Sequence, residues 1–235
     1  MEKTSSQMET LALLHGLRFI DSFFPSGGYA FSSGLEAAVQ GKQIHNAEDL
    51  SRYVEDLFAR GVGRCEAVAV GLGHDAAVSG ELQLALGTDR ELDNMKLSRD
   101  ARMASRQMGR QILRSAGEQA EPSSTLRDFA SEVEGDRSPG HLAVSFGLTL
   151  GTLKWPRQET VAAFLYHTAV GFVSASVKLL PIGQREGQRL LARWMPLIVE
   201  VSRRVEHEKI PTSWSPVQDI YSMRHAHLTT RLFRS

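Results

Sequence analysis

Apolar residues recur every three or four positions along most of the chain, which is the spacing of one face of an α-helix. The clearest case runs from Arg157 to Leu179, where apolar and small residues keep this spacing throughout. Alternating patterns with tight hairpin turns, which indicate strands, are scarce. The pattern predicts an all-α fold, a single-domain bundle of about ten helices packed around the helix over 161–180.

Capping residues predict where helices begin. Asn46 is expected to cap a helix that ends near Gly61, because Asn accepts a backbone N–H at a helix start and Gly is common after a helix end. Ser33 and Glu36 have capping-box spacing, which predicts a short helix beginning at Ser33.

The same signals recur in the second quarter of the chain and after it. Thr88 and Glu91 repeat the capping-box spacing and predict a long helix over 91–116. Ser138 stands before a proline and predicts a helix over 139–150.

The predicted helix over 91–116 has an apolar face and a basic stripe. Arginines one turn apart repel one another, so the stripe needs solvent, a salt-bridge network or an acidic partner to stabilise it. Nucleic acid is a further alternative, but the chain has 27 basic and 27 acidic residues, and this balance argues against it. The stripe consists of Arg99, Arg102, Arg106, Arg110 and Arg114.

Domain organisation follows from the same pattern. The segment 118–124 reads as an internal linker, but the apolar stripes on both sides of it need each other for burial. We therefore expect one domain over 1–235, with 1–8 and 222–235 flexible until a partner binds.

Three features of the sequence bear on the location of the protein in the cell. Residues 160–177 lack Asp, Glu, Lys and Arg, but they only reach the lower limit of spanning length, so we expect a core helix and no membrane. Cys65 is the single cysteine, which excludes an intramolecular disulfide and a cysteine-cluster metal site within one chain. The first residues lack a signal-peptide layout, and a cytoplasmic location is expected.

Catalytic motifs are absent from the sequence. It contains no His-Glu-x-x-His, no Gly-x-Ser-x-Gly and no phosphate-binding glycine pattern. We expect no enzyme activity and no cofactor. His225 and His227 are weak candidates for transient nickel binding, with a solvated tail as the alternative.

Three segments stand apart from this helical pattern. The first runs from Phe23 to Glu36 and is too rich in Gly and Pro to be one helix. It reads either as a buried connection or as a loop that holds Tyr29 and Phe31 for a partner. The second is Lys178 followed by Leu-Leu-Pro-Ile-Gly-Gln-Arg-Glu-Gly-Gln. There the lysine either caps a helix C-terminus or contacts a partner.

The third segment is the tail from Asp219 to Ser235, which ends in Arg-Leu-Phe-Arg-Ser. Leu232 and Phe233 near a free carboxylate are unusual for a frayed terminus, so the tail is expected to dock.

These three segments resemble the patterns of the urease accessory protein UreF family, from about Leu13 to Ser235. The tail departs from the family pattern at Ala226 and Thr229, where the family commonly has an acidic residue and Tyr. Residues 102–109 also resemble a family segment, Arg-x-x-Ser-x-x-x-Gly. The resemblance implies a non-enzymatic homodimer that binds UreD (also called UreH) and recruits the GTPase UreG. The assembly would present nickel to apo-urease, and the chain would modulate GTP hydrolysis by UreG. The alternative is a binding module for acidic partners or nucleic acid that uses the arginine stripe.

Positions carried over from the family are expected to bind partners. We also expect Arg231 and Tyr29 to meet and hold the tail. The partner-binding positions are Tyr29, Phe31, Glu36, Lys178, Gln184, Gln188, Arg224, Arg231, Leu232 and Phe233.

Overall fold

The computed structural model describes residues 8–118 and 124–234, and within them the chain forms eleven α-helices and three short 3-10 helices without a strand. The predicted all-α class is confirmed. Most of the predicted linker 118–124 lies outside the described residues. The helices are α1 (Thr10–Ile20), η1 (Gly28–Ala30), α2 (Leu35–Gln40), α3 (Ala47–Arg60), α4 (Glu66–Ser79), α5 (Leu82–Met95), α6 (Arg99–Gly117), α7 (Thr125–Glu134), α8 (Leu142–Thr152), α9 (Arg157–Leu179), α10 (Gln184–Arg204), η2 (Val205–His207), α11 (Pro216–Arg224) and η3 (His225–His227).

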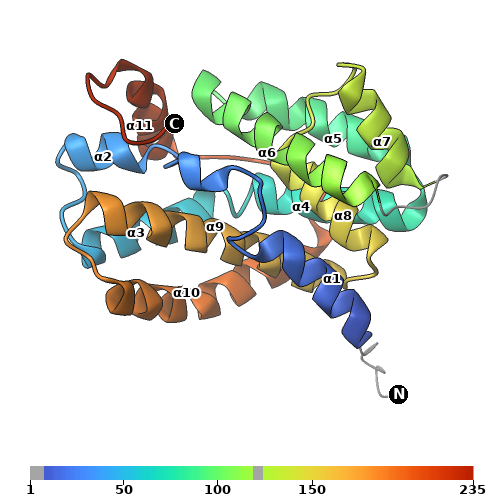
Figure 1. The fold of residues 1–235 in the computed structure, drawn as a ribbon, viewed down its shortest axis with the longest axis horizontal. Coiled ribbons are helices and arrows are strands. Elements are labelled where there is room, and N and C mark those ends of the chain that lie inside the picture. Colours follow the sequence, from blue (N-terminus) through green and yellow to red (C-terminus); the bar gives the residue numbers. More distant parts are fainter. Residues whose placement is uncertain (1–7, 119–123, 235) are drawn as a thin grey trace.

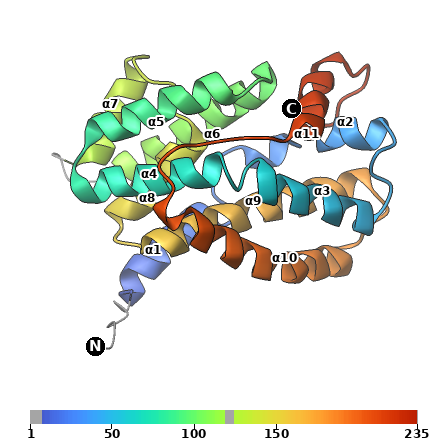
Figure 2. The ribbon, with the colours of Figure 1, turned by 180° about the vertical axis from the view of Figure 1, so that it is seen from behind.

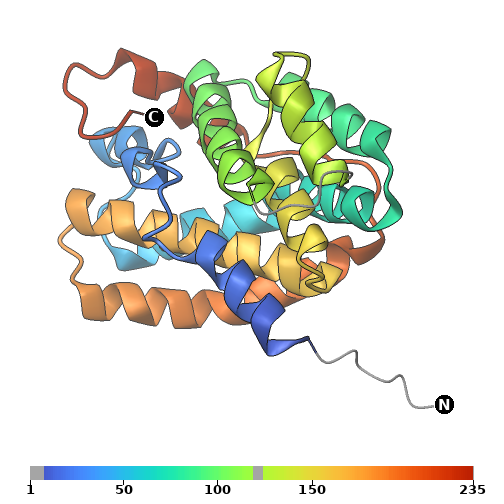
Figure 3. The same cartoon turned by 45° about the vertical axis from the view of Figure 1, so that its right-hand side comes forward.

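The helices form two groups that share one core (Figure 1). Helices α5, α7 and α8 pack on α4, and α6 packs on α7 and α8. Helices α2, α3 and α10 lie along α9. The segment between α10 and α11 crosses the back of the molecule to reach α2 (Figure 2). The C-terminal residues then turn back beside α2 and the segment that precedes it (Figure 3).

Helices α4 and α8 approach more closely than ordinary side chains allow. A Cβ atom at Gly147 would lie 2.1 Å from the Val70 carbonyl oxygen, and one at Gly73 would lie 2.7 Å from that of Val144. All residues from 142 to 151 are buried, so the centre of the fold is this contact together with α9, not α9 alone.

Helix α9 passes the length and hydropathy test for a membrane span, and it is the one helix in the described ranges that does. Its large apolar residues, including Phe164, Leu165 and Phe172, are buried in the protein core. It packs on α3, α4, α8 and α10. These contacts are those of the predicted core helix.

The predicted helix over 91–116 is wrong: two helices, α5 and α6, occupy this region. Thr88 lies inside α5, where its hydroxyl donates to the Leu84 carbonyl (2.8 Å). The chain leaves helical geometry at Lys96, and Ser98 caps α6 by accepting the backbone N–H of Ala101 (3.3 Å). Ser98 therefore supplies the helix start that was assigned to Thr88.

The predicted start of a helix at Pro139 is also wrong, because α8 begins at Leu142. Ser138 does not cap it. Its hydroxyl donates instead to the buried carboxylate of Asp89 (2.7 Å). Gly140 has φ of 77°, which a right-handed helix cannot contain.

Candidate functional site

The loop before α2 lies between α9 and α6. After α1 ends at Ile20, Phe24 packs on Phe19 with ring centroids 5.1 Å apart. The Ser26 hydroxyl accepts the backbone N–H of Gly28 (3.2 Å). At Gly27 φ is 80°, so the chain reverses there and presents Tyr29, which is 76% exposed. The loop is thus structured by its own hydrogen bonds and leaves its tyrosine at the surface.

The start of α2 differs from the predicted capping box. Gly34, with φ of 83°, stands at the N-cap, and the backbone N–H of Glu36 donates to the hydroxyl of Ser32 (3.4 Å), not of Ser33. A Cβ atom at Gly34 would lie 2.9 Å from the backbone nitrogen of Ser222. Glycine at this position therefore allows α11 to approach α2 closely.

The carboxylate of Glu36 anchors the C-terminal tail. It is 1% exposed and accepts the backbone N–H of Leu232 (2.7 Å) and of Phe233 (3.1 Å). The Nε2 atom of His225 lies 3.0 Å from the same carboxylate. A carboxylate with this many donors is well satisfied despite its burial. The residue that looked like part of a helix cap instead joins the first and third motif segments.

Two further hydrogen bonds hold the tail. The backbone N–H of Arg234 donates to the Ala30 carbonyl (2.8 Å), and the Gln40 side chain donates to the Thr230 carbonyl (3.1 Å). The tail therefore bonds to the loop and to α2 along its length.

Neighbouring side chains of the tail face opposite environments. Phe233 is 6% exposed, whereas Leu232 is 72% exposed. The ammonium group of Lys178 lies 5.2 Å from the centroid of the Phe233 ring, a cation–π distance. The second motif segment thereby contacts the third.

The expected contact between Arg231 and Tyr29 is replaced by another. The Arg231 guanidinium lies 4.0 Å from the Asp100 carboxylate at the start of α6. The tail reaches the loop through the backbone of Ala30, the residue next to Tyr29. Asp100 was not among the predicted site residues, since a single acidic residue in a helix's first turn usually serves the helix dipole.

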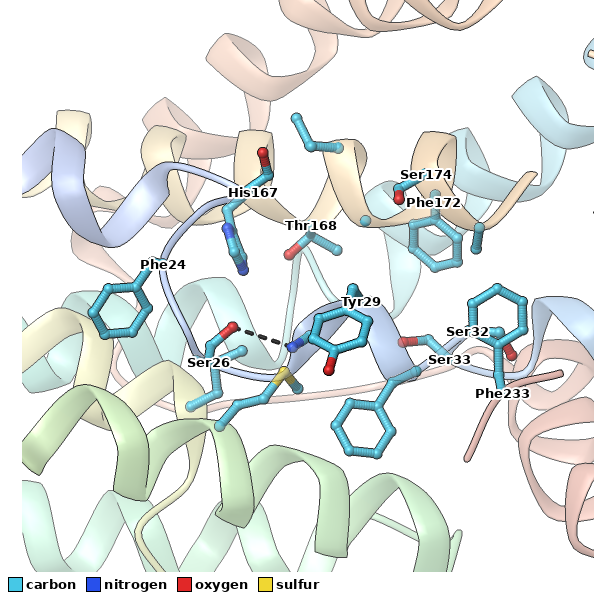
Figure 4. A pocket seen from close by; sticks show the side chains of 18 of the residues that line it. Phe24, Ser26, Tyr29, Ser32, Ser33, His167, Thr168, Phe172, Ser174 and Phe233 are labelled. Atoms are coloured by element: carbon cyan, nitrogen blue, oxygen red, sulfur yellow. Dashed lines mark hydrogen bonds between the residues drawn. The ribbon is translucent and has the colours of Figure 1, made fainter. Parts of the chain in front are cut away.

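A pocket of about 140 Å³ opens between the loop and α9. Figure 4 shows His167, Thr168, Phe172 and Ser174 of α9 on one side and the loop residues on the other. Phe31 and Phe233 also line it, so the pocket joins the loop and tail segments. Sequence reasoning missed His167, because a histidine within an apolar stripe gives no signal of its own.

The remaining predicted residues lie elsewhere or face solvent. Gln184 and Gln188 are exposed on the first turns of α10. Arg224 is exposed, with its guanidinium 5.6 Å from the centroid of the Tyr221 ring. His225 is fully buried and His227 is exposed, and the described residues contain no group of three metal-ligating side chains.

A second histidine cluster lies at the start of α8. The ring of His141, which is fully buried, contacts the Ser105 hydroxyl (3.0 Å) and the Asp93 carboxylate (2.9 Å). Burial lowers the pKa of His141 despite that carboxylate. The Ser105 hydroxyl also accepts the backbone N–H of Leu142 (3.2 Å). These residues have the composition of a catalytic triad, but their hydrogen bonds position α8.

The segment 102–109 lies on α6, where it packs against the start of α8. Ser105 bonds to His141 and Leu142, and a Cβ atom at Gly109 would lie 2.1 Å from the Gly140 carbonyl oxygen. Serine and glycine at this spacing therefore seat α6 against the start of α8.

The arginine stripe on α6 is partly neutralised by the chain itself. Arg106 pairs with Asp93 (2.5 Å) and Arg110 with Asp136 (2.7 Å). Burial would raise the pKa of the Asp93 carboxyl, but hydrogen bonds from Arg106 and His141 hold it below its usual value. These pairs are the salt-bridge network that the sequence left open, and they reduce the charge available to an acidic partner.

Comparisons with known proteins identify the same family as the resemblance. The UreF family model matches residues 44–195. The urease accessory protein UreF of Actinobacillus pleuropneumoniae is 31% identical over 229 residues, covering 95% of this chain and 98% of that protein. The corresponding protein of Xanthobacter autotrophicus is 32% identical over 227 residues, covering 96% and 92%. The chain therefore belongs to the UreF family of urease accessory proteins.

Proposed function

We propose that this chain is a non-enzymatic scaffold in nickel insertion into apo-urease. In this proposal it binds UreD (also called UreH), recruits the GTPase UreG and modulates GTP hydrolysis by UreG. The observation that carries the proposal is the convergence of three motif segments at one surface, through Glu36, Lys178 and Phe233.

The chemistry of this surface suits a protein partner. Tyr29 and Leu232 are exposed apolar residues, and exposed cations, Lys178 and Arg231, lie near them. Stable interfaces combine a few buried aromatic or apolar anchors with a polar rim. The matching partner surface would carry apolar side chains surrounded by carboxylates.

A homodimer is part of the proposal, and α1 offers a surface for it. Leu11, Leu14 and Leu17 follow one another at helical spacing and are 65%, 57% and 43% exposed. An apolar helix face of this kind commonly packs on another protein surface. Replacing Leu14 with Asp should convert a dimer to a monomer in light scattering, whereas replacing exposed Val78 with Asp should not.

The proposal also covers cofactors, location and the classes of partner that the chain does not bind. Nickel is the cargo of the assembly, and the chain holds no resident cofactor. A cytoplasmic location without nucleic-acid or membrane partners is consistent with a balance of 27 acidic and 27 basic residues.

Co-purification with UreD and UreG tests the proposal. The intact chain should retain both partners, and a chain that lacks residues 228–235 should lose them. This truncation keeps α11 and the contact between His225 and Glu36. A matched control, Trp214→Ala, changes a 72% exposed residue outside the tail and should retain both. If the intact chain retains neither partner, the proposal fails.

A further inference from the structure

The pocket beside α9 has the size of one aromatic ring. Its volume is about 140 Å³, and an engineered apolar cavity of about 150 Å³ in another protein binds benzene. The walls include Phe24, Phe31, Met108 and Phe172, which supply apolar contacts for a ring.

One wall residue gives the pocket a directed hydrogen-bond acceptor. The Nδ1 atom of His167 lies 3.2 Å from the Ile20 carbonyl oxygen, and a carbonyl only accepts, so Nδ1 carries the proton. Burial lowers the pKa of His167, so the ring is neutral near pH 7 and Nε2 holds a lone pair. In Figure 4 the imidazole of His167 points from α9 toward the loop.

The described part of the chain offers this acceptor no hydrogen-bond donor. Among residues 8–118 and 124–234, none donates a hydrogen bond to His167 Nε2. The ring of Phe146 packs on this imidazole with centroids 6.4 Å apart, which limits its rotation. A ligand that fills the pocket would bury Nε2, and a buried acceptor without a donor is unfavourable.

We propose that this pocket receives the ring of a tyrosine side chain presented by the protein that docks at the tail site, with its hydroxyl donating to His167 Nε2. A phenylalanine would leave that atom unpaired. The pocket shares Tyr29 and Phe233 with the surface described above, which favours a side chain of a docked protein over a free molecule. The inference rests on the proposed function for its partner, but the pocket's ligand chemistry can be tested without one.

Phenol serves as the probe for the isolated chain, and toluene as its counterpart without a hydroxyl. Gly171 lines the pocket, and a Cβ atom there would have no heavy atom within 4 Å. Gly171→Leu therefore has room for its Cβ atom, and the rest of the side chain should narrow the pocket and reduce phenol binding at least tenfold in calorimetry or ligand-observed NMR. Gly87→Leu is the matched control, because Gly87 is also helical, exposed and open, and it should bind phenol as the unmodified chain does.

His167→Phe separates the ring from the hydrogen bond. It should weaken phenol binding roughly tenfold, the effect of one hydrogen bond, and leave toluene binding unchanged. If the unmodified chain binds neither probe, or binds toluene as tightly as phenol, the pocket chemistry proposed here is wrong.

The partner arm uses the complex with UreD and UreG. If Gly171→Leu weakens the complex at least tenfold and Gly87→Leu does not, the ring comes from a partner. If phenol binds but Gly171→Leu leaves the complex intact, the pocket serves a free small molecule and the proposal is overturned. If the unmodified chain forms no complex, the proposed function fails, while phenol binding still decides the ligand chemistry.

Discussion

Two buried carboxylates in this protein make similar hydrogen bonds but hold different parts of the chain in place. Asp89 accepts the Ser138 hydroxyl and the backbone N–H groups of Gly140 and His141, at 2.7–2.8 Å. Glu36 accepts two backbone N–H groups of the tail and contacts His225. The first holds the start of an internal helix, and the second holds the last residues of the chain.

The residues around Asp89 and those around Glu36 differ in how fully their polar atoms are paired and in how exposed their neighbours are. His141, beside Asp89, has partners at both ring nitrogens. His225, beside Glu36, is fully buried. Its Nε2 atom has a hydrogen-bond partner, whereas its Nδ1 atom has none among the described residues, although the Asp100 carboxylate lies 3.9 Å from it. Leu232, next to the segment that Glu36 holds, is 72% exposed. The fully hydrogen-bonded residues around Asp89 suit a fixed part of the fold. The less completely paired residues around Glu36 suit a segment that contacts partners.

The largest expected effect is at Asp89. Asp89→Ala would leave three buried donors without an acceptor, so the free energy of unfolding should fall by about 3–5 kcal/mol. Urea denaturation measures this. Asp136→Ala is the control, because that carboxylate pairs with Arg110 but is 81% exposed, and it should change stability by less than about 1 kcal/mol. Equal effects would contradict the comparison.

A smaller and local effect is expected at Glu36. Glu36→Gln keeps the size of the side chain but provides fewer acceptor sites, so the free energy of unfolding should fall by about 1–3 kcal/mol. Hydrogen exchange at the amides of Leu232 and Phe233 should accelerate, while the amides of α8 keep their protection. Acceleration throughout α8 would show that the two clusters are not independent.

The adjacent tail residues should separate docking from recognition. Phe233→Ala removes a buried ring, so tail amides should exchange faster and partner binding should weaken. Leu232→Ala removes an exposed side chain, so exchange should stay the same while partner binding weakens about tenfold, as for an interface anchor. If Leu232→Ala accelerates exchange as much as Phe233→Ala does, the division between the two residues is wrong.

The smallest expected effect is the dependence of stability on pH. Burial lowers the pKa of both His141 and His167 in the folded chain. In the unfolded chain these rings take up protons near pH 6.5, so the unfolded state binds more protons and stability falls as pH drops below that value. Urea titrations at pH 7.5 and 5.5 should show this decrease. His167→Phe should reduce it, and a decrease of unchanged size would contradict the assignment.

Periodicity and local caps were sufficient for much of the fold. Asn46 accepts the backbone N–H of Asp49 (2.9 Å), as its position before an apolar stripe predicts. Helix α9 has the predicted bounds, since its apolar spacing is long and uninterrupted. Such features depend on neighbours within a few residues, which a single sequence displays directly.

The helix starts were wrongly predicted where a capping residue instead bonds to a residue far away in the sequence, or where another residue caps the helix. Ser138 bonds to Asp89, which lies far away in sequence, instead of capping α8. Glu36 bonds to the tail instead of closing a capping box. Capping-box spacing at Thr88 gave a false start because Ser98 offered the actual cap.

The segments that form the site were predicted from the sequence, but the contacts between them were not. Tyr29, Lys178 and Phe233 could be named from the resemblance to the UreF family. Their convergence depends on the bonds of Glu36 and on the close approach at Gly34. No spacing in the sequence reveals such contacts.

We propose that Glu36 holds the tail in the form that partners bind. The most direct measurement is the affinity of Glu36→Gln for UreD and UreG, beside Glu48→Gln, whose side chain is 60% exposed and pairs with Arg193 at the surface. Glu36→Gln should bind these partners at least tenfold more weakly, and Glu48→Gln should bind them as the unmodified chain does. Unchanged affinity in a Glu36→Gln chain whose tail amides exchange rapidly would contradict it.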